Sequence, residues 1–209
     1  GVALIGRFPA RIPGPWEGIH PAESKDATTP GAALASAALM RIDPHSYTDD
    51  AQAQVTALDW EARVDFARHT LDATVTLMLD RGTSGDLDLD TRGLTVLSAH
   101  DDSGLPVDFT LHPEEPILGA RLTLHLPRTT QSVTLVYRTA PDASALQWLD
   151  PAQTAGGAQP FLFSQCQAIH ARSVVPLQDT PQRRITFRAT LTVPSALRAL
   201  MAAGFEGRT

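Results

Sequence analysis

The segment Thr70-Leu71-Asp72-Ala73-Thr74-Val75-Thr76-Leu77-Met78-Leu79 decides the fold class, because its side chains alternate between two kinds. A period of two, rich in β-branched residues, is typical of a strand with one buried face. The threonines share one face of this strand, which we expect to meet solvent. The segment therefore predicts a half-buried antiparallel strand.

Short segments of the same kind lie on both sides of this strand. Alternating residues precede it from Arg63 to Ala67, and others follow it at residues 86–90 and 93–98. Further strands are expected at residues 107–111, 121–126, 133–138, 161–165 and 185–193. Turn residues separate them at 81–85, 101–104, 113–116, 127–130 and 141–142.

Strands that recur about every 8 to 12 residues predict a mainly β domain, with mixed and antiparallel sheets in a saddle-like or sandwich arrangement. Little helix is expected, and only residues 194–201 read as one or two helical turns. Residues 1–40 are different, because they mix Pro, Gly and Ala without a sustained period. They also lack the basic start and continuous apolar stretch of a signal peptide. We interpret 1–40 as a leader or tail of unknown role and 41–209 as the domain.

Composition narrows the classes of function. The formal charge of -6 argues against nucleic acid, since phosphate binding needs a basic face. The sequence contains no run of about 18 apolar residues, which a membrane-spanning helix requires, so we expect no membrane partner. Cys166 is the single cysteine, which excludes an internal disulfide and favours a cytoplasmic location.

Two clusters of acidic residues are candidates for a catalytic or metal-binding site. A calcium loop that starts at Asp86-Leu87-Asp88-Leu89-Asp90 needs Gly at position 91 and Glu at position 97, where the chain has Thr91 and Leu97. We therefore expect the three aspartates on the solvent face of a strand. Glu114 and Glu115 stand between prolines, and their spacing favours a solvated turn over a pair with separated pKa values.

Cys166 with His170 is a candidate nucleophile and base. Such a thiol needs a cation or a helix terminus to lower its pKa, and the apolar segment before Cys166 favours a small buried filler instead. The sequence contains no G-x-S-x-G and no H-E-x-x-H.

Gln165 and Gln167 flank Cys166 at the end of an apolar, aromatic strand. Amides in such a place must find hydrogen-bond partners or face a polar cavity. They suit the recognition of a peptide amino terminus, because a glutamine carbonyl accepts from an ammonium group without a buried charge. An equally open alternative is that both amides only bond to neighbouring loops.

Eight stretches of the sequence form a recognisable set: Val64-Asp65-Phe66, Arg68-His69-Thr70-Leu71, Ser144-Ala145-Leu146-Gln147-Trp148-Leu149, Pro151-Ala152-Gln153-Thr154, Phe161-Leu162-Phe163-Ser164-Gln165-Cys166-Gln167-Ala168-Ile169-His170-Ala171-Arg172, Pro176-Leu177-Gln178-Asp179-Thr180-Pro181, Thr192-Val193-Pro194 and Leu197-Arg198-Ala199-Leu200-Met201. Together they resemble the leukotriene A4 hydrolase branch of the M1 family of zinc aminopeptidases. The resemblance covers roughly residues 55 to 203 and leaves out the first 40 or so.

The resemblance implies an amino-terminal saddle of β-sheets over a carboxy-terminal catalytic domain of the same protein. It implies that Gln167 helps to hold the α-amine of a peptide substrate, and that Gln165 contacts the first side chain or the backbone. Cys166 belongs to the same segment, and Ala168 would lie near the first specificity pocket. Pro176 to Pro181 would be a packing loop, with Asp179 structural.

The resemblance implies a zinc ion in the full-length enzyme, and this sequence lacks the family's H-E-x-x-H and Gly-x-Met-Glu-Asn motifs. We therefore expect the chain alone to bind no zinc and to be inactive. Two alternatives stay open: a stand-alone, non-catalytic β scaffold or docking domain, and part of a bifunctional epoxide hydrolase.

Overall fold

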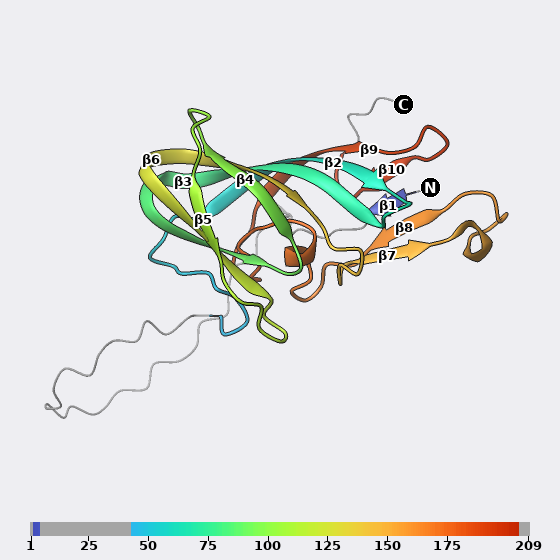
Figure 1. The fold of residues 1–209 in the computed structure, drawn as a ribbon, viewed down its shortest axis with the longest axis horizontal. Coiled ribbons are helices and arrows are strands. Elements are labelled where there is room, and N and C mark those ends of the chain that lie inside the picture. The colour runs from blue at the N-terminus through green and yellow to red at the C-terminus, as the bar shows by residue number, and fades with distance from the viewer. Residues whose placement is uncertain (1, 5–42, 205–209) are drawn as a thin grey trace, which may run out of the picture.

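The computed structural model describes residues 2–4 and 43–204, and most of the described residues lie in two mixed sheets (Figure 1). The larger sheet has the strand order β4-β6-β3-β2-β9, with β5 paired to β6. All its neighbours are antiparallel except β2 and β9, which run parallel. Its strands are β2 (Val55–Asp65), β3 (Thr70–Thr91), β4 (Thr95–Asp101), β5 (Asp108–Leu111), β6 (Ala120–Arg138) and β9 (Thr186–Thr192). The mainly β prediction is confirmed.

The smaller sheet has the order β10-β1-β8-β7. Its strands are β1 (Val2–Leu4), β7 (Leu146–Leu149), β8 (Phe161–Ser164) and β10 (Ala199–Met201). β1 lies between β10 and β8 and runs parallel to both. Of the segment 1–40, only these three residues are among the described ones, so the division into a leader and a domain stays a prediction.

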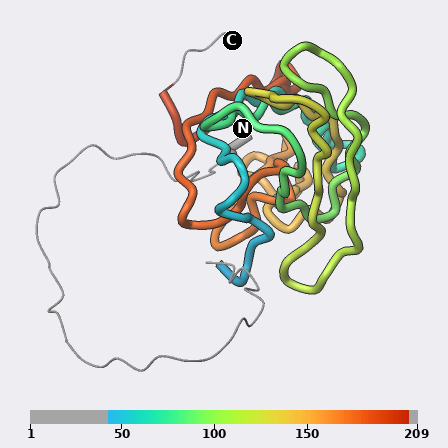
Figure 2. The backbone as a smooth tube through the Cα atoms, turned by 90° about the vertical axis from the view of Figure 1, so that its left-hand side faces the viewer, coloured from blue at the N-terminus to red at the C-terminus, as the bar shows by residue number. Residues whose placement is uncertain are grey.

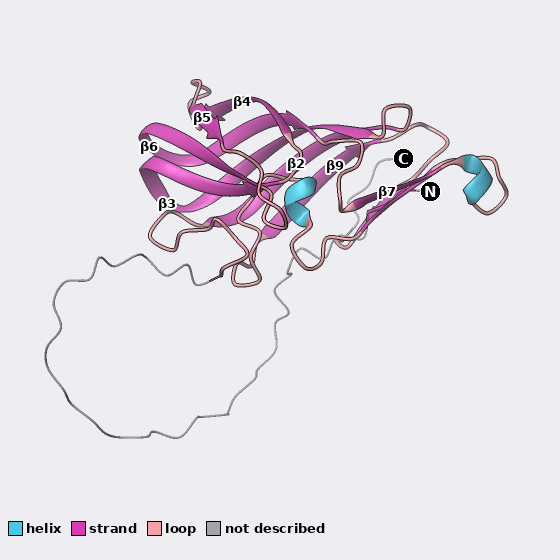
Figure 3. Ribbon diagram, turned by 60° about the horizontal axis from the view of Figure 1, so that its bottom comes forward, coloured by secondary structure: helices cyan, strands magenta, loops and turns pink. Residues whose placement is uncertain are grey.

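Helix is confined to single turns in the described part of the chain, namely η1 (Pro151–Gln153) and η2 (Ala171–Ser173), drawn in cyan in Figure 3. Neither could cross a membrane, and no other described segment forms a long apolar helix. The predicted helix at 194–201 is wrong. The chain makes a turn there, closed by Leu197 N donating to Pro194 O at 2.8 Å, and then enters β10. Strand pairing overrides a weak local helix preference.

β3 and β6 are each longer than predicted. The turns expected at 81–85 and 127–130 are wrong, because both segments stay in the strands and pair with each other. The register shifts between Met78 and Gly85, as in a β-bulge. Gly85, with φ of 89°, lies in this irregular part. Bulges and turns favour the same residue types, so the composition of residues 81–85 and 127–130 could not distinguish a bulge from a turn.

The core lies between the curved larger sheet and the segment that follows β8 (Figure 2). Residues 171–180 are all buried, and this orange segment lies inside the curve of the strands. Trp60 and Tyr137 are the two largest buried aromatic residues, and Trp60 Nε1 donates to Tyr137 Oη at 2.8 Å. The bond satisfies an indole N–H that burial would otherwise leave without water.

Candidate functional site

The glutamine segment begins where β8 ends. Gln165 N donates to Ala145 O at 2.9 Å, which is the last backbone bond before the chain turns away. Gln165, Gln167 and Ala168 are exposed, whereas Cys166 between them is buried. The peptide bond from Gln167 to Ala168 is cis. Gln165 and Gln167 present two neutral amides at the surface, and we call residues 165–168 the glutamine loop.

A small pocket of about 70 Å³ adjoins the glutamine loop. Its lining includes Gln167 and Ala168 on one side and Gln178, Thr180 and Arg183 on the other. The guanidinium of Arg183 makes an ion pair with Asp50. Gln178 accepts from Val55 N and donates to Ala53 O, and Thr180 Oγ1 donates to Asp43 Oδ2, so this side of the pocket is held by the protein's own hydrogen bonds.

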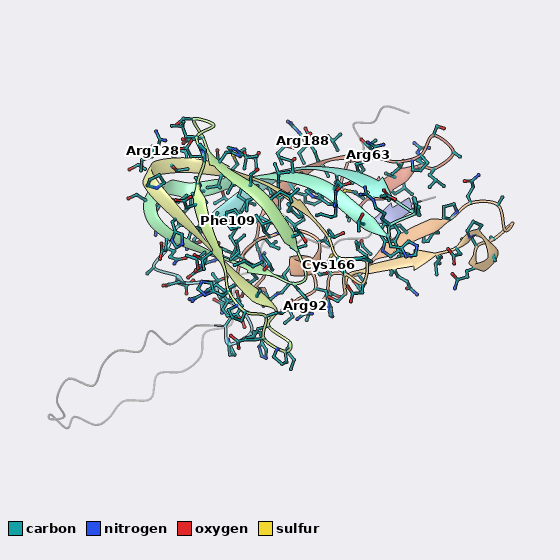
Figure 4. All side chains as sticks on the ribbon, in the orientation of Figure 1. Arg63, Arg92, Phe109, Arg128, Cys166 and Arg188 are labelled. Carbon is teal, nitrogen blue, oxygen red and sulfur yellow. The ribbon has the colours of Figure 1, made fainter. Side chains whose placement is uncertain are left out.

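The structure does not pair Cys166 with His170 as nucleophile and base. His170 Nδ1 lies 2.8 Å from Ser144 Oγ and 3.4 Å from a guanidinium nitrogen of Arg92. Figure 4 shows Cys166 and Arg92 in the same part of the molecule. Burial raises the pKa of the Cys166 thiol to about 12, and the charge of Asp179 adds to the rise. Cys166 is therefore a buried filler, as the sequence favoured.

We expect Cys166 to resist alkylation in the folded chain. With a pKa of about 12, the thiolate fraction at mildly alkaline pH is roughly a thousandfold below that of an ordinary exposed cysteine. Mass spectrometry after timed iodoacetamide treatment measures the rate, with the denatured chain as the control. Equal rates for the folded and denatured chains would contradict the burial of this thiol.

Only one of the three alternating aspartates lies on the solvent face, so that prediction is wrong for the other two. Asp86 is exposed, whereas Asp88 is 9% exposed and Asp90 is fully buried. At this end of β3 both faces are covered. Asp90 Oδ2 accepts from Ser46 Oγ at 2.6 Å and from Asp179 N at 2.8 Å, and its Oδ1 accepts from Tyr47 N at 2.7 Å.

Arg172 lies beside Asp90 and is also fully buried. Its Nε donates to Asp179 Oδ2 at 3.1 Å, and its two terminal nitrogens donate to Leu118 O at 2.6 Å, His45 O at 2.8 Å and Asp179 O at 2.9 Å. One of them also lies 3.6 Å from Asp90 Oδ1. We call Asp90, Arg172 and Asp179 the arginine cluster.

Burial raises the pKa of both Asp90 and Asp179, although the charge of Arg172 and their hydrogen bonds act against the rise. Asp179 is structural, as the resemblance implied. Sequence reasoning assigned no role to Arg172. The available signal was an arginine inside the mostly apolar run 168–177, since such a residue is seldom buried without a carboxylate partner.

Within residues 2–4 and 43–204, no three His, Cys, Asp or Glu side chains are placed to hold a metal ion. The described side chains therefore do not fit a catalytic zinc, which needs three protein ligands.

Comparison with known proteins places the chain in a family. Residues 44–204 match the model of the peptidase M1 N-terminal domain. Leukotriene A-4 hydrolase of Xenopus laevis is 34% identical over 172 residues, which are 79% of this chain and 28% of that protein. Leucine aminopeptidase 2 of Yarrowia lipolytica is 41% identical over 129 residues, which are 60% of this chain and 20% of that protein.

Solved structures agree with these relatives. The yeast LTA4 hydrolase in complex with bestatin superposes with a TM-score of 0.67 at 32% identity, over 73% of this chain and 25% of that one. The chain thus spans well under half of the length of the proteins that it resembles.

Proposed function

Because this chain belongs to the peptidase M1 N-terminal domain family, we propose that it forms one wall of the substrate cleft of a zinc aminopeptidase and helps to bind the peptide amino terminus. The observation that carries the proposal is the exposure of Gln165 and Gln167 on either side of the buried Cys166. Side chains that only served the packing of neighbouring loops would be covered by them.

The chemistry of the glutamine loop fits this role. The carbonyl oxygen of Gln167 accepts a hydrogen bond from an ammonium group, and the amide NH2 of Gln165 donates to a peptide carbonyl. A neutral amide binds the charged amine without the cost of a second buried charge. Both contacts orient the substrate, which raises the rate of a reaction that other groups carry out.

The partner of this wall would be a carboxy-terminal catalytic domain of the same protein. That domain would hold the zinc, which when bound supplies an activated water. The relatives are much longer than the region they share with this chain, which leaves room for such a domain. We keep a cytoplasmic location as part of the proposal, on the evidence of the single cysteine.

The test is Gln167→Ala in the longer protein that carries this chain. Loss of one hydrogen bond to a charged group costs about 1.5–3 kcal/mol, so kcat/KM for a peptide substrate should fall roughly 10- to 150-fold. Steady-state kinetics with a tripeptide and with an amino-acid anilide measure the effect. The unfolding midpoint should stay unchanged, because the side chain is exposed.

Gln131→Ala is the matched control. Gln131 is also an exposed glutamine, and it lies on β6 three residues after Arg128, which Figure 4 shows well away from Cys166. The kinetics of this variant should not change. Unchanged kinetics for Gln167→Ala would contradict the role assigned to the glutamine loop. If the longer protein cleaves no peptide at all, the alternative of a non-catalytic docking domain is favoured.

A further inference from the structure

The arginine cluster joins segments that are far apart in the sequence. Arg172 is bound to the carbonyl oxygens of His45, which precedes β2, and of Leu118, which lies between β5 and β6. Through Asp90 it is tied to the end of β3, and through Asp179 to the loop 176–181. Its own backbone oxygen accepts from Arg92 N at 2.9 Å. One side chain therefore fixes the relative position of four segments.

The glutamine loop is connected to this cluster by a short run of backbone. His170 N donates to Cys166 O at 3.0 Å, and Ser173 Oγ donates to His170 O at 2.8 Å. η2 follows at once and contains Arg172. Asp179, Gln178 and Thr180 line the pocket that faces Gln167. A shift of Arg172 would thus move both sides of this pocket.

Stability alone does not call for a buried arginine at this place. Well-packed apolar side chains often replace a buried ion pair with no loss of stability. An arginine fixes the relative positions of the groups around it, because its planar guanidinium fork bonds several acceptors at fixed angles. Here the fork uses Nε and both terminal nitrogens toward Asp179, Leu118 and His45.

From this geometry we propose that Arg172 is a positioning residue for substrate binding, which acts by fixing the orientation of the glutamine loop. The inference rests on the function proposed above. It names a residue that touches no substrate and yet controls how Gln167 meets the peptide amine.

A double-mutant cycle between Arg172→Lys and Gln167→Ala in the longer protein tests this inference. Lysine keeps the charge between Asp90 and Asp179 but cannot reach the separate acceptors of the fork. In the original background we expect Arg172→Lys to raise KM and lower kcat/KM by roughly tenfold, since displacement of about 1 Å is enough for such losses. In the Gln167→Ala background the same change should cost less than about twofold.

A purely structural role predicts a different result. Partial unfolding would lower kcat per total enzyme at an unchanged KM, and by the same factor in both backgrounds. That additive outcome would overturn the inference and leave the proposed function intact. If Gln167→Ala itself has no effect, the proposed function fails and the inference fails with it, so the two failures are separable in one set of measurements.

If Arg172→Lys does not fold, Asp179→Asn replaces it in the double-mutant cycle. The amide keeps the shape of the side chain but weakens its bonds to Arg172 Nε and to Arg172 N. We expect the same non-additive pattern with Gln167→Ala. Arg128→Lys is the matched control, because Arg128 also pairs with a buried aspartate, Asp101, at the far end of the sheet (Figure 4). It should leave KM unchanged.

Discussion

Arg172→Met is expected to lower the free energy of unfolding of this chain by about 3–5 kcal/mol, the cost of removing one partner from a buried ion pair. Methionine fills much of the same volume but carries no charge and no donor. Asp90 and Asp179 would remain buried without a counter-charge. The carbonyl oxygens of His45 and Leu118 would also lose their donor. This loss is a large part of the total stability of an ordinary domain, about 5–15 kcal/mol.

The loss of unfolding free energy in Arg172→Met should depend on pH, and the pKa shifts of Asp90 and Asp179 decide whether it grows or shrinks as the pH rises. Burial already raises the pKa of Asp90 and Asp179 above 3.8, and the charge of Arg172 opposes it. Without Arg172 both folded-state pKa values rise further. A raised value stabilises the folded state at pH below the unfolded value, and this contribution is lost as the pH rises through the folded value. The deficit of the variant should therefore be smaller near pH 3.8 than at neutral pH, while the cost of the two unpaired carbonyl groups stays the same at every pH.

The neighbouring carboxylates leave this sign unchanged. Although burial acts to raise it, the pKa of Asp43 is lowered by bonds from Thr180 and His45 and, to a smaller extent, by Arg172. Removal of Arg172 therefore raises the pKa of Asp43 as well. Asp65 and Asp101 are shifted by other partners, so their contributions cancel in the difference between the two proteins.

Urea unfolding of the original chain and of the variant, followed by tryptophan fluorescence across the acidic and neutral range, measures this deficit. Arg138→Met is the control. Arg138 is 42% exposed and pairs at the surface with Asp72, so its loss should cost at most about 1 kcal/mol. A deficit for Arg172→Met as small as that of the control, or one that shrinks as the pH rises, would contradict a charged cluster at this site.

The sequence predicted the strands well where one face is buried. The alternation in residues 70–79 places Leu71, Val75 and Leu77 in the core, and all three are fully buried. Such a period depends only on local residues and can be read without the fold. The bulges in β3 and β6 could not be read in this way, because whether glycine and polar residues turn or continue depends on the partner strand.

The glutamine loop was predictable as a group of residues but not as a geometry. Its amides stood out at the end of an apolar strand, and the structure leaves Gln165 and Gln167 exposed, while their binding role stays a proposal. The arginine cluster was not predictable as a group, because Asp90 lies more than 80 residues before Arg172 and Asp179, although these two are only seven residues apart. Asp90 alternates with leucines as a solvent-facing residue would, and only the docking of residues 46–47 and 177–179 covers it.

Gly119→Ala is expected to be the second most destabilising of the changes considered, at about 2–5 kcal/mol, which combines a left-handed residue with an overpacked contact. Gly119 has a φ of 80°, and a Cβ atom at this position would overlap the carbonyl oxygen of Thr91. Thr91 belongs to β3, whose backbone cannot move aside without breaking its pairing with β6. The loop 115–119 would have to move instead.

Movement of that loop would also reach the arginine cluster, since Leu118 O accepts from Arg172 and Gly119 O accepts from Tyr47 Oη at 3.2 Å. Gly104→Ala separates the two causes. Gly104 has a similar φ of 78° but no atom within 4 Å of the added carbon, so it bears only the left-handed cost of about 1–2 kcal/mol. Urea unfolding of both variants gives the difference. Equal losses of unfolding free energy for Gly119→Ala and Gly104→Ala would contradict the close approach of loop 115–119 to β3. They would also contradict the position of Leu118 O as an acceptor for Arg172.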